Sequence, residues 1–212
     1  MIKKAEGWSI VLLGYWNRMI FTPEWVGSNL FGSGSSVETV VALLPVLPII
    51  YRDTSVSIEI SNSRIICRSR RLDSEHALQG VGKTAHEILR LLPETPVKAI
   101  GVNYEFVENS PSENLVELFS FGDDAPLGEA GWTTEERKIV RRLSDEDDDT
   151  LNFTLTYGGE ELTVSCNFHT AVDNDHDIAL GAVADDRVAN LEDKALLLLK
   201  NYYGLILEES DE

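Results

Sequence analysis

The sequence predicts an α+β fold, in which antiparallel strands form hairpins and meanders that are each followed by a packing helix. The first observation is a hairpin pattern, in which Val56–Ile60 and Arg64–Arg68 flank a Ser-Asn-Ser turn. The second is a pair of strand patterns, Leu151–Tyr157 and Glu161–Phe168, on either side of a Gly-Gly dipeptide. The third is a helical repeat of apolar residues after each hairpin. Because this order occurs twice, we expect two pseudo-repeated lobes that share a core.

The N-terminal elements follow from short local signals. The apolar run Trp8–Leu13 indicates a buried strand. A helix should follow, because Thr22 is a typical N-cap residue and Pro23 suits the first helical position. We expect this helix to end near Phe31, before a Gly-Ser connector. The run Val37–Tyr51 contains two prolines, which cannot donate to a central ladder, so it predicts an edge strand or two short strands.

Three helical patterns and one long strand pattern make up most of the rest. Apolar residues recur at helical spacing from Ser74 to Leu92, and Pro93 ends the run. Alternation over Val97–Val107 predicts a strand. A shorter helix is expected over Glu113–Phe119, and a long amphipathic one over about Arg187–Tyr203.

One stretch, Trp132–Leu143, fits two structures. Thr133 and Glu136 make a capping box, which favours a helix. The same stretch also fits a charged edge strand that leads into the second hairpin. We take the helix as the expectation and the strand as the alternative.

Negative charge is concentrated in the second half of the chain. The 212 residues carry a formal net charge of -18, but residues 1–100 contribute +2 and residues 101–212 contribute -20. We therefore expect a near-neutral strand and helix half over residues 1–108 and a strongly acidic half over 109–212. At this length, the two halves can also form one continuous domain.

The charge and the cysteines limit the classes of partner and compartment. A strongly negative field repels phosphate backbones and acidic lipids, so direct nucleic-acid binding is not expected. The sequence contains no apolar run of membrane-spanning length, and we expect no membrane partner. Cys67 and Cys166 lie in apolar strand patterns without zinc-ligand spacing, which predicts two buried thiols in a cytoplasmic protein. No cofactor is expected.

A glycine-containing segment imitates part of a nucleotide-binding loop. Gly80–Thr84 matches the end of a P-loop, but the glycine required five residues before Gly82 is replaced by Ala77. The preceding residues also read as helix rather than as a buried strand. We therefore expect a helix with an exposed Lys83.

Three aspartates form the best candidate metal site. Asp173, Asp175 and Asp177 alternate as they do at the start of a calcium-binding loop. The later positions that require Gly and Glu hold Ile178 and Ala184, which excludes an EF-hand. The expectation for this segment is a solvated loop. The alternative is a looser cation site, joined by His169, which would support a metal-dependent hydrolase.

The leading functional hypothesis is a non-catalytic interaction or assembly protein that presents an acidic surface to a basic protein or to another copy of itself. It rests on the charge asymmetry and on the absence of a complete catalytic motif. The metal-dependent hydrolase is one alternative, and an inhibitor or immunity-type protein that mimics nucleic-acid charge is another. The candidate partner-binding residues are the continuous acidic run Asp145, Glu146, Asp147, Asp148 and Asp149.

Overall fold

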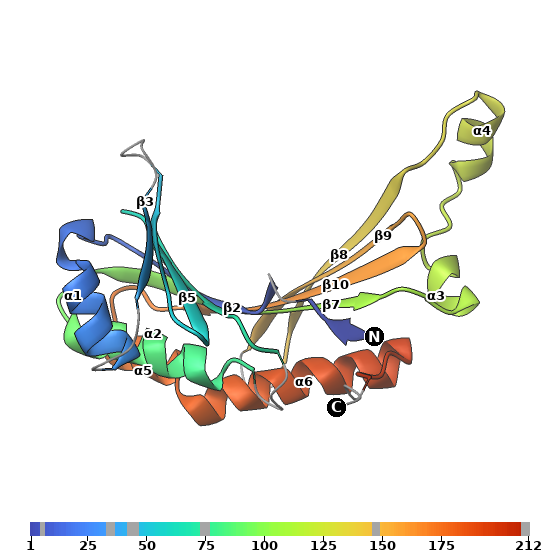
Figure 1. The fold of residues 1–212 in the computed structure, drawn as a ribbon. Coiled ribbons are helices and arrows are strands. Elements are labelled where there is room, and N and C mark those ends of the chain that lie inside the picture. The colour runs from blue at the N-terminus through green and yellow to red at the C-terminus, as the bar shows by residue number, and fades with distance from the viewer. Residues whose placement is uncertain (5–6, 33–36, 42–46, 73–76, 146–148, 209–212) are drawn as a thin grey trace.

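The computed structural model describes residues 1–4, 7–32, 37–41, 47–72, 77–145 and 149–208, and it confirms an α+β fold. The strands of these residues form one ten-stranded antiparallel sheet. Figure 1 shows that the sheet is strongly curved, with the long helices along its convex side and an open concave face. An antiparallel sheet tolerates one solvated face, provided that the other face is covered.

The strands lie in a simple order across the sheet, β3-β4-β5-β6-β2-β7-β10-β9-β8, and β1 pairs with β7. Elements of the two halves are therefore separated on either side of the β2–β7 pair. The strand bounds are β1 Ile2–Lys3, β2 Ser9–Gly14, β3 Glu38–Val41, β4 Ile49–Arg52, β5 Val56–Ile60, β6 Arg64–Ser69, β7 Val97–Glu108, β8 Glu136–Ser144, β9 Thr150–Gly158 and β10 Glu161–Ala171.

The helices follow the strands in a repeated order. A strand, a short helical segment, a meander and a packing helix occur first from β2 onward and again from β7 onward, which agrees with the expected pseudo-repeat. Helices α2, α5 and α6 contact one another and neighbouring strands of the sheet. The helix bounds are α1 Pro23–Val26, continued by a π-helical turn over Gly27–Phe31, α2 Gln79–Leu91, α3 Glu113–Glu117, α4 Asp124–Glu129, α5 His176–Ala182 and α6 Asp185–Tyr203.

Local signals account for the first half. The Thr22 hydroxyl accepts a hydrogen bond from the Trp25 amide at 3.2 Å, as its role as N-cap requires. The proline-containing run forms two short strands, and β3 is the outer one. In the β5–β6 hairpin, Val56, Ile58 and Ile60 are buried and the residues between them are half-buried. Period-2 patterning thus places one face of the hairpin in the core.

The two halves meet in a shared aromatic core. The Trp8 side chain, just before β2, is fully buried. Its ring packs edge-on against Tyr104 and Phe106 of β7, at centroid distances of 5.1 and 5.5 Å. The indole N–H donates to the Glu105 carbonyl at 2.8 Å. Buried residues of both halves belong to one hydrophobic cluster.

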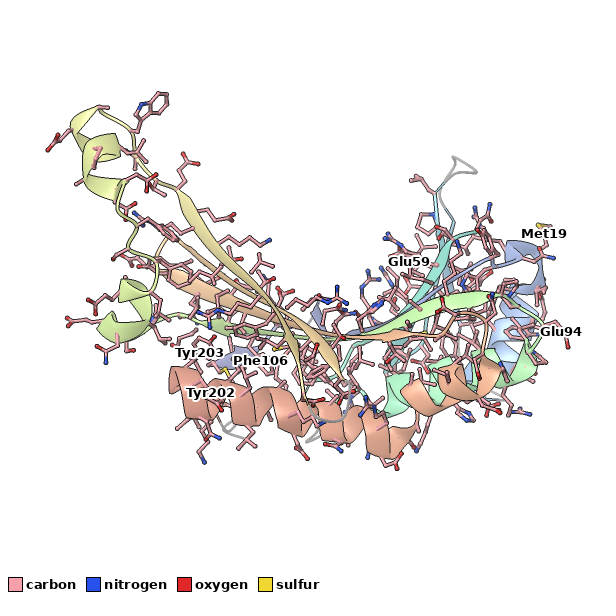
Figure 2. The ribbon with its side chains drawn as sticks, turned by 180° about the vertical axis from the view of Figure 1, so that it is seen from behind. Met19, Glu59, Glu94, Phe106, Tyr202 and Tyr203 are labelled. Carbon is pink, nitrogen blue, oxygen red and sulfur yellow. The ribbon has the colours of Figure 1, made fainter. Side chains whose placement is uncertain are left out.

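A ladder of polar side chains crosses the middle of the open face. Asn103 of β7 lies directly opposite Asn167 of β10, and the Asn167 amide donates to the Asn103 side-chain oxygen at 2.6 Å. Asn152 of β9 donates to Asn167 at 3.0 Å, and Asn103 donates to the Ser9 hydroxyl at 3.2 Å. These bonds satisfy the amides on the solvated face. Glu59 also lies on this concave side and pairs with arginines of β6 (Figure 2).

The helix expected over Trp132–Leu143 is wrong, and the alternative is correct. Residues Glu136–Ser144 form β8, the outer strand of the second half. Nine consecutive residues pair with β9, which satisfies backbone groups along one whole edge, whereas a capping box acts only on the first turn of a helix. Ile139 and Leu143 are half-buried and Val140 is exposed, as a half-buried strand requires.

The other helices and turns deviate from expectation in smaller ways. Helix α2 begins at Gln79 rather than Ser74, and residues 73–76 lie outside the described residues. The β9–β10 turn places Gly159 and Glu160, not the two glycines, at its central positions, with φ values of +60° and +78°. Helix α5 forms where the sequence indicated a solvated loop. In the described part of the chain, no helix is both long enough and apolar enough to span a membrane.

Candidate functional site

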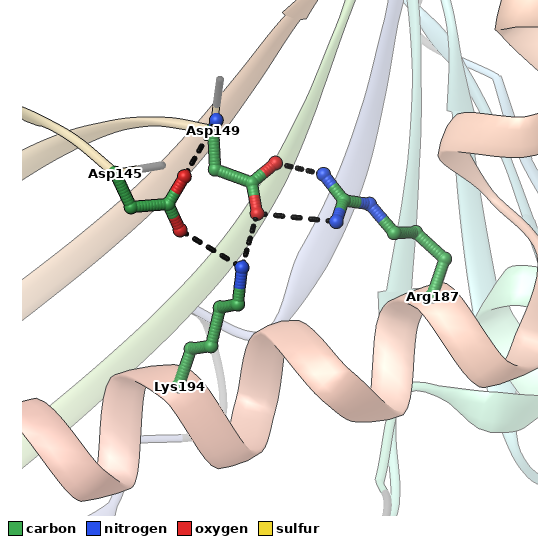
Figure 3. A network of polar contacts seen from close by, with 4 residues as sticks. All are labelled: Asp145, Asp149, Arg187 and Lys194. Atoms are coloured by element: carbon green, nitrogen blue, oxygen red, sulfur yellow. Dashed lines mark hydrogen bonds and ion pairs between the residues drawn. The ribbon is translucent and has the colours of Figure 1, made fainter. Parts of the chain in front are cut away.

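Two residues of the predicted acidic run, Asp145 and Asp149, form ion pairs with cations of α6. Asp145 follows β8 and Asp149 precedes β9, so both lie where the strands turn above α6 (Figure 3). Arg187 and Lys194 are seven residues apart, about two helical turns, and therefore point to the same side of α6. Lys194 Nζ lies 2.8 Å from Asp145 Oδ2 and 2.8 Å from Asp149 Oδ2.

Asp149 is the centre of this network. Its side chain is only 8% exposed, and the Arg187 guanidinium binds both of its carboxylate oxygens. The Asp149 amide also donates to Asp145 Oδ1 at 2.9 Å. Burial acts to raise the pKa of the Asp149 carboxyl, but hydrogen bonds from Arg187 and Lys194 outweigh burial and hold this pKa below its ordinary value.

Replacing Asp149 with asparagine is expected to reduce the free energy of unfolding by about 1.5–3 kcal/mol at neutral pH, because charge-assisted hydrogen bonds are lost. A lowered native pKa stabilises the fold above the unfolded pKa and loses this effect as the pH falls through the native value. The difference between wild type and D149N should therefore be full at pH 7 and shrink below about pH 4. Urea unfolding across this range measures it.

The matched control is Asp193→Asn, which removes the same charge from an exposed position of α6. It should change the free energy by less than about 0.5 kcal/mol. Equal losses for the two variants would contradict a specific role of the network.

The structure answers only part of the partner-binding prediction for this run. Asp149 is buried in the network, and Asp145 shares Lys194 while its side chain stays 41% exposed. Glu146, Asp147 and Asp148 lie outside the described residues. Recognition of a partner by the run stays a prediction.

The predicted cation site is not assembled. Asp175 is the N-cap of α5, and its carboxylate accepts hydrogen bonds from the amides of Asp177 and Ile178 at 3.0 and 3.1 Å. Asp173 has φ +46°, in the turn before the cap. Within the described residues, which include these aspartates and His169, no three His, Cys, Asp or Glu side chains are placed to hold a metal ion. The hydrolase hypothesis thus gains no geometric support.

The segment that imitates a P-loop lies inside α2, as a helix. Thr84 donates from its hydroxyl to the Gly80 carbonyl at 3.0 Å, one turn earlier. Gly82 permits close packing, because a Cβ there would come within 3.3 Å of the Val183 carbonyl. Lys83 is exposed, 3.9 Å from an Asp185 oxygen. Backbone N–H groups engaged within a helix do not form a phosphate cradle.

Both cysteines are buried free thiols, as expected. Burial raises the pKa of Cys67 and of Cys166 to about 12, so both remain protonated at neutral pH. Thiolate is the nucleophilic form of cysteine. Neither residue is therefore suited to nucleophilic catalysis.

A different acidic feature becomes evident in the structure. We define the acidic arm as residues 109–136, which connect β7 to β8 and contain α3 and α4. Figure 1 shows that this segment projects from the far end of the sheet. The arm has no Lys or Arg, and its seven carboxylates are Glu113, Glu117, Asp123, Asp124, Glu129, Glu135 and Glu136.

The arm is anchored at one end and open at the other. Leu115 and Phe119 are buried, and the Phe119 ring packs on Tyr157 of β9 at a centroid distance of 5.4 Å. Asp124 holds α4 through an ion pair with Arg137, at 2.9 Å. None of the residues of α4 is buried.

Large apolar side chains are exposed among these acids. Trp132 is 71% exposed, and three others on the arm are between 38% and 45% exposed: Leu118, Phe121 and Leu127. Four exposed apolar side chains thus lie within residues 118–132, and apolar side chains that gather on one surface often mark an interaction site. The sequence contained a signal for the arm, because 28 residues with seven acids and no base include Phe121 and Trp132. The sequence-based prediction of a partner site used the denser acidic run from Asp145 to Asp149 instead.

Comparison with known proteins adds no relative. No protein family matches the sequence, and no curated protein is similar to it. The functional argument therefore rests on the surfaces of the chain itself.

Proposed function

We propose that this protein is a non-catalytic interaction protein that binds a basic protein partner through the acidic arm. The observation that carries the proposal is the exposure of Trp132, Phe121, Leu127 and Leu118 among seven carboxylates on a projecting segment. The proposal moves the partner site from the Asp145 to Asp149 run to the arm.

The two kinds of side chain supply different parts of recognition. Carboxylates in excess over neighbouring bases attract a cationic surface over distance and raise the association rate. Exposed aromatic and aliphatic side chains supply most of the affinity once they are buried in a pocket of the partner. An arm that served only solubility would need the carboxylates but not the Trp132 side chain. The complementary partner is a basic surface with an apolar cleft.

The sheet order favours a polarised molecule. Strands β8 to β10 lie together beyond β7, so the strands of the acidic half are not interleaved with those of the near-neutral half, whereas α5 and α6 also contact α2 of the near-neutral half. The turn residues Glu160 and Glu161 also lie at the end of the sheet that carries the arm, because Glu136 pairs with Gly158. Acids outnumber the bases Arg137 and Lys138 at that end, so a partner would meet a predominantly negative field there.

Site-specific photocrosslinking in the native cell tests the proposal. A photoreactive amino acid at position 132 should capture a basic protein, and the same group at Met19, which is 84% exposed on the opposite lobe, should not. Capture of the same proteins from both positions, or of acidic proteins only, would count against the arm. The captured protein is then identified and purified for titration.

Charge-matched variants then measure the contribution of the arm. The arm variant carries Gln in place of four exposed glutamates, Glu113, Glu117, Glu129 and Glu135. The control variant neutralises four exposed acids elsewhere, as Glu94→Gln with Asp173, Asp177 and Asp193 changed to Asn. We expect the arm variant to raise Kd roughly tenfold or more and the control to raise it less than about threefold. Equal weakening would show that only net charge acts.

A further inference from the structure

A cavity of about 590 Å³ lies between the β8–β9 end of the sheet and the C-terminal half of α6. Its volume falls within the range of about 300–1,000 Å³ that is typical of small-molecule sites. Most of its surface is apolar. The side chains that form the apolar part are Leu143, Leu151, Phe168, Leu197, Leu198, Tyr202 and Tyr203.

Buried core residues form the interior of the cavity, and exposed residues of α6 form its rim. Leu151 and Phe168 are 6% and 5% exposed and belong to the main core. Tyr203 packs on Phe153 of β9 at a centroid distance of 5.3 Å. Leu197 and Tyr202 are 59% and 80% exposed, and Figure 2 places both tyrosines at the end of α6. A preformed apolar site with apolar side chains at its border suits an apolar ligand.

Among the described residues that line the cavity or pair with its lining, the charges leave one cation in excess. Asp145 and Asp149 are balanced by Lys194 and Arg187, so this network has no net charge. Arg141 of β8 also lines the cavity, and within the described residues no carboxylate forms an ion pair with it. It pairs with Phe153 across the strands and therefore lies on the helix-facing side of β8. Its charge acts on Tyr203, lowering the pKa that burial of Tyr203 raises.

We infer that this cavity binds a small amphiphilic carboxylic acid, with its carboxylate on Arg141 and its apolar body against Leu143, Leu151 and Phe168. A guanidinium binds a carboxylate through two parallel hydrogen bonds, and such bonds are strong beside apolar surface. A cationic ligand would find Asp145 and Asp149, the carboxylates among the described lining residues, already paired. A neutral ligand would leave Arg141 without a counter-ion. The inference is independent of the acidic arm.

Calorimetric titration with three ten-carbon probes tests the ligand class. Decanoate, decanol and decylamine share an apolar chain and differ in charge, and each is used below the concentration at which it forms micelles. Wild type should bind decanoate at least about tenfold more tightly than decanol, and it should not bind decylamine measurably. Equal binding of decanoate and decanol, or no binding of decanoate, would overturn the inference.

Two neighbouring arginines provide a matched pair of variants. Arg141→Gln removes the cation from the cavity, whereas Arg142→Gln makes the same change on the open face, opposite Asn152. We expect R141Q to weaken decanoate binding about tenfold or more and R142Q to change it less than about threefold. Equal effects would mean that decanoate responds to net charge only.

A third variant tests the position of the apolar chain. Leu197 of α6 lines the cavity and is 59% exposed, so Leu197→Trp should fill it without changing the core. L197W should abolish decanoate binding while its thermal unfolding remains within a few degrees of wild type. Unchanged decanoate binding by folded L197W would place the probe elsewhere and overturn the site.

Discussion

Replacing Lys3 with methionine is expected to reduce the free energy of unfolding by about 3–5 kcal/mol, because the change removes a cation that pairs with a buried carboxylate. Glu192 of α6 is 1% exposed, and its Oε1 lies 3.3 Å from Lys3 Nζ of β1. The Lys3 ammonium also lies over the Trp8 ring, 4.5 Å from its centroid. Because a small domain is stable by only about 5–15 kcal/mol, this loss should be evident in denaturant unfolding.

The double variant Lys3→Met with Glu192→Leu separates charge from packing. Replacing both members of a buried ion pair with apolar residues is often neutral or stabilising. We therefore expect the double variant to recover most of the stability that K3M loses. If it were no more stable than K3M, the cause of the loss would be packing around Trp8 rather than the buried charge of Glu192.

Replacing Trp8 with alanine is expected to cost about 3–5 kcal/mol and to destabilise both halves together. The indole fills the joint between β2 and β7, where it packs on Tyr104 and Phe106. Trp8→Phe retains a ring but loses the hydrogen bond to the Glu105 carbonyl, so we expect a smaller loss than for W8A. Urea unfolding followed by circular dichroism gives both values.

Hydrogen exchange shows whether the halves are coupled. In W8A, amides of the β5–β6 hairpin and of the β9–β10 hairpin should lose protection by a similar factor, because they share one hydrophobic cluster. Unchanged protection in β9–β10, with loss confined to β5–β6, would show that residues of the second half fold independently. That result would divide the chain near β7.

The Lys3–Glu192 ion pair also helps to position α6, which forms one wall of the proposed cavity. Glu192 lies on α6 between Arg187 and Lys194, whose side chains hold Asp149. A helix fixed at the sheet by Lys3 and at the β8–β9 turn by Asp149 keeps one wall of the cavity in place. The acidic arm is attached separately, through Phe119 and Asp124, so variants of its exposed residues should leave α6 unchanged.

Hairpins, caps and amphipathic helices were predictable because their signals act over a few residues. Alternation in Val56–Ile60, the Thr22 cap and the apolar stripe of α6 each define a structure that neighbouring residues can satisfy alone. Strand β8 was harder to predict. In β8 the local capping box competed with nine pairings to β9, and only the presence of β9 decides between them.

The sequence by itself determined the fold class and the strong acidity of the second half. Tertiary structure alone decided what each charge does, because the energy of an ion depends on its burial and on partners that are distant in the chain. Asp149 is bound by α6, Glu192 is buried against β1, and Arg141 lines an apolar cavity without a carboxylate partner among the described residues. Charges that look alike in the sequence thus differ in burial and in ion-pair partners according to where the fold places them.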